Sequence, residues 1–93
     1  KNTTGYANVG IGALTGFQNE TGNHNTIIGH AAGYGIGGNN PSGSVFIGYN
    51  AGYLETDDNK LYIENTASPF PLIGGDFSTN EVTINGTIKI TGG

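Results

Sequence analysis

The ten residues Asn25-Thr-Ile-Ile-Gly-His-Ala-Ala-Gly-Tyr34 decide the fold, because the chain repeats their pattern on both sides of them. The stretches Asn8-Val-Gly-Ile-Gly-Ala-Leu-Thr-Gly-Phe17 and Ser44-Val-Phe-Ile-Gly-Tyr-Asn-Ala-Gly-Tyr53 have the same order of an Ile-Gly pair, a second Gly and an aromatic residue. A fourth stretch, Lys60-Leu-Tyr-Ile-Glu-Asn65, keeps the apolar part and lacks the Gly-aromatic part. Repeats of this kind are typical of proteins built from stacked structural units.

The repeated isoleucine marks the centre of each unit. Ile11, Ile28, Ile47 and Ile63 are separated by 17, 19 and 16 residues. We expect a short apolar strand at each of them, followed by a bend at the Gly and a polar turn into the next unit. The pattern therefore predicts an all-β fold, namely a repetitive β-roll or β-solenoid of about four short rungs stacked about 4.8 Å apart.

The composition agrees with an ordered β-protein and excludes several other classes. Of the 93 residues, 18 are Gly, 12 are Asn and 11 are Thr, and these types disfavour helix. Hydrophobic residues still make up 34% of the chain, which is more than a disordered chain usually has. Three Lys and a net charge of −4 disfavour binding to nucleic acid, and no apolar run is long enough for membrane insertion by this segment.

Alternation along the strands places apolar side chains on both of their faces. A stack of four short strands is too thin to cover both faces by itself, so the pattern predicts a homotrimer in which the chains cover one another. We expect one face to form the core of the roll and the other to form the oligomer interface. The predicted roll core is Val9, Ile11, Ile28, Val45, Ile47, Leu61 and Ile63, and the predicted interface on the repeats is Ile27, Phe46 and Tyr62.

The chain changes character after Asn65, which predicts Gly-rich repeats over 1–65 and a C-terminal strand and hairpin over 66–93. Pro69 and Pro71 end the repeats, because proline lacks the N–H that a strand ladder needs. Alternating stretches on both sides of Asn85-Gly86 predict a hairpin with a type I′ turn. Its apolar residues extend the predicted interface, and they are Val82, Ile84, Ile88 and Ile90.

Residues with a capacity for chemistry are few. His24 and His30 are the only imidazoles and have no obvious third metal ligand, so we expect no metal, no cofactor and no enzyme activity. Tyr34, Tyr49 and Tyr53 form a candidate ligand surface on which sugar rings would stack. The alternative is that one aromatic residue in each repeat stacks on the next and stabilises the units.

The repeats at Asn8–Phe17, Asn25–Tyr34 and Ser44–Tyr53 resemble the head repeats of trimeric autotransporter adhesins. Together with Asn59–Asn65 and Val82–Ile90, they are also similar to Gly-rich repeats found upstream of intramolecular chaperone domains of the endosialidase type. Such repeats occur in phage tail fibres, tailspikes and bacterial surface proteins. The resemblance implies a homotrimer of parallel β-rolls that is extracellular, at a cell surface or on a virion tail fibre.

These observations predict a structural segment, a shaft or head, of a homotrimeric extracellular fibre or adhesin. A second hypothesis is a carbohydrate- or receptor-binding module that holds its ligand on the tyrosines or on the loop Gly35–Gly43. A third is the subunit of an extracellular filament that polymerises end to end through an uncapped strand. The expected partners are further copies of the chain and a host-surface glycan or protein receptor.

Overall fold

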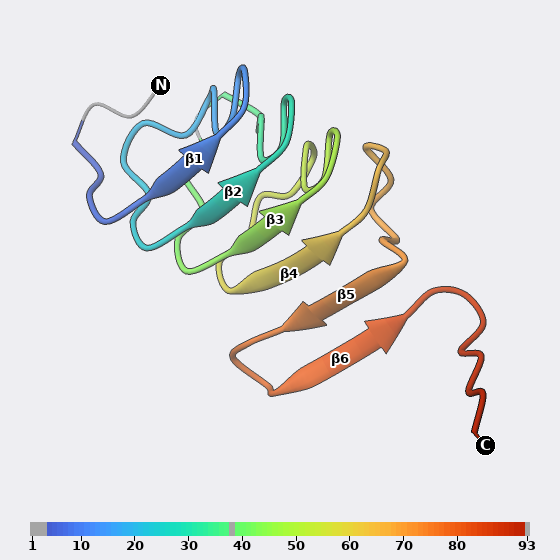
Figure 1. The fold of residues 1–93 in the computed structure, drawn as a ribbon. Helices are drawn as coiled ribbons and strands as arrows, with labels where there is room; N and C mark the ends of the chain where they lie inside the picture. Colours follow the sequence, from blue (N-terminus) through green and yellow to red (C-terminus); the bar gives the residue numbers. More distant parts are fainter. Residues whose placement is uncertain (1–3, 38, 93) are drawn as a thin grey trace.

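The protein folds as one six-stranded sheet whose strands lie side by side in chain order (Figure 1). The structure is a computed structural model that describes residues 4–37 and 39–92. The described residues form no helix, so none is available to cross a membrane. The predicted all-β class is confirmed. The strands are β1 (Val9–Ile11), β2 (Thr26–Ile28), β3 (Val45–Ile47), β4 (Lys60–Ile63), β5 (Ile73–Asp76) and β6 (Glu81–Ile84).

The first four strands are parallel and pair in the register that the repeated isoleucine predicts. Ile11 is the partner of Ile28, Ile28 of Ile47, and Ile47 of Ile63. After β4 the chain reverses twice, so that β4–β5 and β5–β6 are antiparallel pairs. The sheet runs without a break past residue 65, and what changes there is the direction of the strands.

The Gly that follows each of β1, β2 and β3 has a backbone conformation that repeats from unit to unit. Gly29 and Gly48 have φ of 127° and 122°, a region that residues with a side chain rarely adopt. A Cβ at Gly29 would lie 2.6 Å from the carbonyl oxygen of Gly48, and one at Gly48 would collide with the carbonyl oxygen of Glu64. Glycine therefore permits both the bend and the close stacking of neighbouring units.

A ladder of polar side chains joins the units where the strands begin. The backbone N–H of Asn25 donates to Oδ1 of Asn8 at 3.0 Å, and that of Ser44 donates to Oδ1 of Asn25 at the same distance. The N–H of Lys60 donates to Oγ of Ser44 at 3.2 Å. Each polar side chain thus satisfies the N–H of the following unit, which accounts for the burial of Asn25 and Ser44.

A second ladder, two residues earlier in each unit, runs in the opposite direction. The N–H of Tyr6 donates to Oδ1 of Asn23, that of Asn23 to Oγ of Ser42, and that of Ser42 to Oδ1 of Asp58. These bonds are 2.9 to 3.0 Å long. The two ladders therefore tie each unit to both of its neighbours, and they fix the parallel register of β1 to β4.

The core lies on the face of the sheet that the sequence pattern predicts to be the oligomer interface. Ile27, Phe46 and Tyr62 are buried there, with Phe46 only 1% exposed, against Ala32 and Ala51 of the segments that follow β2 and β3. The predicted facing of the strands is therefore wrong. The predicted roll core lies on the opposite face, where Val9, Ile11 and Ile63 are exposed and Ile28, Val45, Ile47 and Leu61 are half-buried.

Small residues explain why this face of the sheet, and not the other, is buried in the core. A Cβ at Gly33 would lie 2.8 Å from the ring of Phe46, and one at Gly52 would lie 2.5 Å from it. The segments after the strands therefore fold back onto the Phe46 side, where their Ala and Gly residues leave room for large side chains. Tyr62 completes the core with an edge-to-face contact to Phe46, the ring centroids lying 5.5 Å apart.

The C-terminal hairpin also differs from the prediction. β6 pairs with β5 through a turn over 77–80, whereas Thr87–Ile90 forms no strand. The expected turn at Asn85-Gly86 does not form, because the N–H of Asn85 donates to the carbonyl of Leu72 and its Nδ2 to that of Pro71. The actual turn has Asp76 accepting from the N–H of Ser78.

Candidate functional site

One face of the sheet carries an isoleucine from every strand. Successive strand pairs bring Ile11, Ile28, Ile47, Ile63, Ile73 and Ile84 into register, so that they form one row across the sheet, called here the isoleucine row. Three of its members come from the Ile-Gly pairs of the repeats, and three from β4 to β6. The row therefore continues unchanged where the sheet passes from parallel to antiparallel pairing.

A second row lies beside it, two residues earlier in the parallel strands. Its members are Val9, Thr26, Val45, Leu61, Gly75 and Val82. The two rows together, called here the uncovered face, contain no charged side chain. The charged residues of β4 to β6, namely Lys60, Asp76 and Glu81, alternate onto the opposite side.

The uncovered face stays accessible in the single chain. Ile11 is 57% exposed and Val82 is 68% exposed, at the two ends of the face. Ile28, Ile47, Ile73 and Ile84 are half-buried, in the row where isoleucine lies beside isoleucine. An apolar surface that continues over a whole sheet is rare on monomers and marks an interaction site.

The candidate ligand tyrosines do not form one platform. Tyr34 and Tyr53 stack on each other with centroids 4.7 Å apart and planes 3° apart, and Phe17 stacks on Tyr34 at 5.0 Å. Tyr49 belongs to another stack, on His30 at 5.7 Å. The alternative interpretation, a ladder of one aromatic residue per repeat, is confirmed for Phe17, Tyr34 and Tyr53. Tyr34 stacks on a ring on each side, so neither of its faces is available to a sugar.

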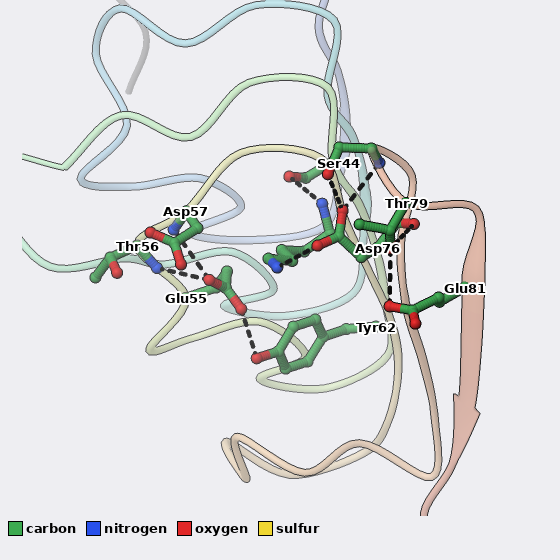
Figure 2. A network of polar contacts seen from close by, with 10 residues as sticks. Ser44, Glu55, Thr56, Asp57, Tyr62, Asp76, Thr79 and Glu81 are labelled. Atoms are coloured by element: carbon green, nitrogen blue, oxygen red, sulfur yellow. Dashed lines mark hydrogen bonds and ion pairs between the residues drawn. The ribbon is translucent and has the colours of Figure 1, made fainter.

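A groove of about 390 Å³ lies beside β4, β5 and β6. Its walls include Lys60, whose Nζ forms an ion pair of 2.9 Å with Asp76, and Tyr62, whose hydroxyl donates to Glu55 at 2.7 Å. Figure 2 shows the Tyr62 hydroxyl pointing at Glu55, whose second carboxylate oxygen accepts from the N–H groups of Thr56 and Asp57. The side chains of Lys60 and Asp76, and those of Tyr62 and Glu55, are thus occupied with each other.

The ionisation of the groove residues follows from these contacts. The hydroxyl of Ser78 and the ammonium of Lys60 donate to the carboxylate of Asp76 and lower its pKa to about 2. Burial, together with the hydrogen bond to Glu55, raises the pKa of the Tyr62 phenol. Both shifts keep the groups in the charge state that their partners need, which is a structural role.

No family model, curated protein or solved structure matches the chain. The geometry of the site therefore carries the functional argument.

Among residues 4–37 and 39–92, no group of three or more His, Cys, Asp or Glu side chains is placed to hold a metal ion. His24 lies edge-on to Tyr6, with centroids 5.4 Å apart, and His30 stacks on Tyr49. The two histidines thus contact different aromatic rings.

The uncovered face is the best candidate site, and sequence reasoning found only part of it. Val82 and Ile84 were predicted at the interface and lie on this face. Ile73 was missed as a site residue. The signal for it was the position of Leu72-Ile73 after the prolines, which marked a strand but not its facing.

Proposed function

We propose that the chain is a structural segment of an extracellular fibre or adhesin in which three copies associate through the uncovered face. The observation that carries the proposal is the isoleucine row, which crosses all six strands and is covered by no helix or second sheet among the described residues. Residues 4–65 would form the stacked rungs of a β-solenoid. The resemblance of the repeats to adhesin heads and tail-fibre segments favours the same function and an extracellular location.

A further copy of this chain is the partner that fits the face best. The face has no charge, so a charged ligand has nothing to pair with. Its side chains recur at the strand spacing of about 4.8 Å, and close packing requires a partner with the same repeat. A second copy of the chain has the same sequence and therefore the same spacing of side chains.

The size of the face favours three chains over two. Its two rows are about 7 Å apart and extend about 24 Å across the strands, because alternate residues of a strand are about 6.6 Å apart. A stable interface buries roughly 800 Å² on each partner, which is more than this narrow face offers to one neighbour. Around a three-fold axis parallel to the row, each chain contacts two neighbours, and the flanks of the face are buried as well.

The test is the mass of the particle in solution. We expect the wild-type chain to sediment as a trimer and the variants Ile47→Lys and Ile11→Lys to sediment as folded monomers, because each places a charge in the interface. Leu54→Lys is the matched control, since Leu54 is an exposed apolar residue outside the uncovered face, and it should remain a trimer. Circular dichroism checks that the variants are folded.

A wild-type chain that sediments as a monomer would overturn the proposal, and so would folded Ile47→Lys and Ile11→Lys variants that remain trimers. Ile11 lies at the exposed end of the row, so its substitution separates loss of association from loss of folding.

A further inference from the structure

No described strand pairs with the outer edge of β1. β1 is the first strand of the sheet and pairs with β2 alone among the described residues. All three of its residues are exposed, and none of them is charged. An open edge with free backbone N–H and C=O groups is a template for a further strand.

The core is also open beside this edge. Gly10 is the partner of Ile27, so it stands where the following strands carry Ile27, Phe46 and Tyr62, and it contributes no side chain. A cavity of about 160 Å³ lies there, and Gly10, Thr15 and Ile27 are among the residues that line it. A cavity of about 150 Å³ holds a benzene molecule, so this one has room for an isoleucine side chain.

The C-terminal segment Thr87–Ile90, called here the tail, has the complementary properties. It alternates Thr-Ile-Lys-Ile, a pattern of β-branched residues that favours a strand, yet it forms none in this structure. Ile88 is 65% exposed and Ile90 is 87% exposed. These two side chains are two residues apart, so in an extended strand both would point to one side, and Lys89 would point to the other.

We propose that the tail of one copy pairs with the outer edge of β1 of a second copy, with Ile88 opposite Gly10 and seated in the cavity over Ile27. The tail would supply the core side chain that Gly10 lacks, and its backbone would satisfy the open edge. Lys89 would then lie on the side of Val9 and Ile11, and its long side chain would carry the ammonium past the flank of the trimer contact into solvent.

The positions of the two surfaces make this contact head-to-tail. β1 and the tail lie at opposite ends of a molecule that measures 50 × 27 × 21 Å (Figure 1). The tail is therefore far from β1 of its own chain. Because donor and acceptor surfaces differ, the contact is heterologous and can be repeated from one copy to the next. The proposed contact rests on the proposed fibre function, to which it adds axial contacts. The two residues that it brings together, Gly10 and Ile88, lie outside the uncovered face.

Cysteine cross-linking of the full chain tests the contact, because the chain has no native cysteine. With Ile88 opposite Gly10, residue 89 faces residue 9 if the strands are antiparallel and residue 11 if they are parallel. We expect one of the double variants, Val9→Cys/Lys89→Cys or Ile11→Cys/Lys89→Cys, to oxidise to a ladder of species longer than three chains on a denaturing gel. The variant that does so gives the strand direction.

Three controls define the result. The single-cysteine variants link at most two chains, and Leu54→Cys/Lys89→Cys measures chance collisions between exposed sites. Adding Ile88→Asp to the reactive double variant should abolish the ladder, because a carboxylate is costly in the cavity. The inference is overturned if neither double variant exceeds the Leu54 control, or if Ile88→Asp leaves the ladder intact.

The same gel separates this contact from the trimer. In an Ile47→Lys background the lateral association should be lost while the ladder remains, since Ile47 lies in the interior of the sheet, away from β1 and the tail. A tail of four residues buries too little surface to hold dilute chains together, so this variant sediments as a monomer, whereas oxidation traps the brief head-to-tail contact each time it forms. A ladder from a chain that never forms trimers would refute the proposed trimer and support the head-to-tail contact.

Discussion

At the scale of the residue, Gly48 shows that close stacking of the units requires glycine at the bend after the strand. Its φ of 122° is strained for any other residue, and a Cβ would collide with Glu64 of the next unit. We expect Gly48→Ala to lower the free energy of unfolding by on the order of 1–3 kcal/mol, as other strained backbone conformations do. Urea denaturation measures the change.

Gly37→Ala is the matched control for this prediction. Gly37 has no positive φ, and among the described residues outside its chain neighbours a Cβ there would meet only Oε1 of Gln18, at 3.7 Å, an ordinary contact. Its substitution should leave stability unchanged or raise it slightly, because alanine restricts the unfolded chain. Equal losses in the two variants would contradict the role assigned to the Gly after the strand.

Single residues also show what the sequence could reveal. The isoleucine column identified the strands and their register, because a residue that recurs once per unit stacks on itself. The side that is buried depends on where the next segment folds back, and alternation with apolar residues on both faces leaves that open. The sequence feature that indicates the buried side is the pair of small residues Ala32-Gly33, repeated at Ala51-Gly52. These small residues leave room for the large side chains of Ile27 and Phe46.

At the scale of the element, one ion pair joins β4 to β5. Asp76 accepts hydrogen bonds from Ser78 and from Lys60, and its pKa falls from an ordinary 3.8 to about 2. The pKa is lower in the folded chain, so the stabilisation is fully present above about pH 4 and disappears as the pH falls to about 2. We expect acid to weaken the pairing of β4 and β5 in this window.

The measurement is the pH dependence of the unfolding midpoint. Asp76→Asn should flatten it between about pH 4 and about pH 2, whereas Glu81→Gln on the adjacent strand, which leaves Asp76 and both its donors in place, should retain most of it. An unchanged profile in Asp76→Asn would show that other carboxylates govern the acid response.

The C-terminal hairpin shows the limit of local signals at this scale. Asn-Gly between two alternating stretches favours a tight turn. Here Nδ2 of Asn85 donates to the carbonyl of Pro71, and its N–H donates to the carbonyl of Leu72. These contacts with a distant segment hold Asn85 in place, and the tight turn does not form. The stretch Asp76-Phe-Ser-Thr-Asn80 makes the turn instead, with Asn80 at a φ of 59°.

At the scale of the whole molecule, the proposed trimer makes stability depend on concentration. Association of folded chains draws the equilibrium away from the unfolded state. We expect the melting temperature of the wild-type chain to rise with protein concentration and that of Ile47→Lys to stay constant. Thermal unfolding followed by circular dichroism over a dilution series measures both, and a wild-type midpoint independent of concentration would contradict the trimer.

Phe46→Asp provides the contrasting case for the same series. Phe46 is in the core of the single chain, so its replacement by a carboxylate should unfold the chain at every concentration rather than release a folded monomer. A folded Phe46→Asp monomer would mean that the core assignment is wrong.

Because the two ladders of side-chain hydrogen bonds repeat in every unit, the molecule can be lengthened only by complete units. Each unit meets its neighbours through the same polar positions, so copying one complete unit would add a single strand spacing, about 4.8 Å, and preserve which side faces outward. Inserting one residue within a strand would instead invert every side chain beyond it. Duplication in units of the repeat is therefore the route by which such a molecule can grow.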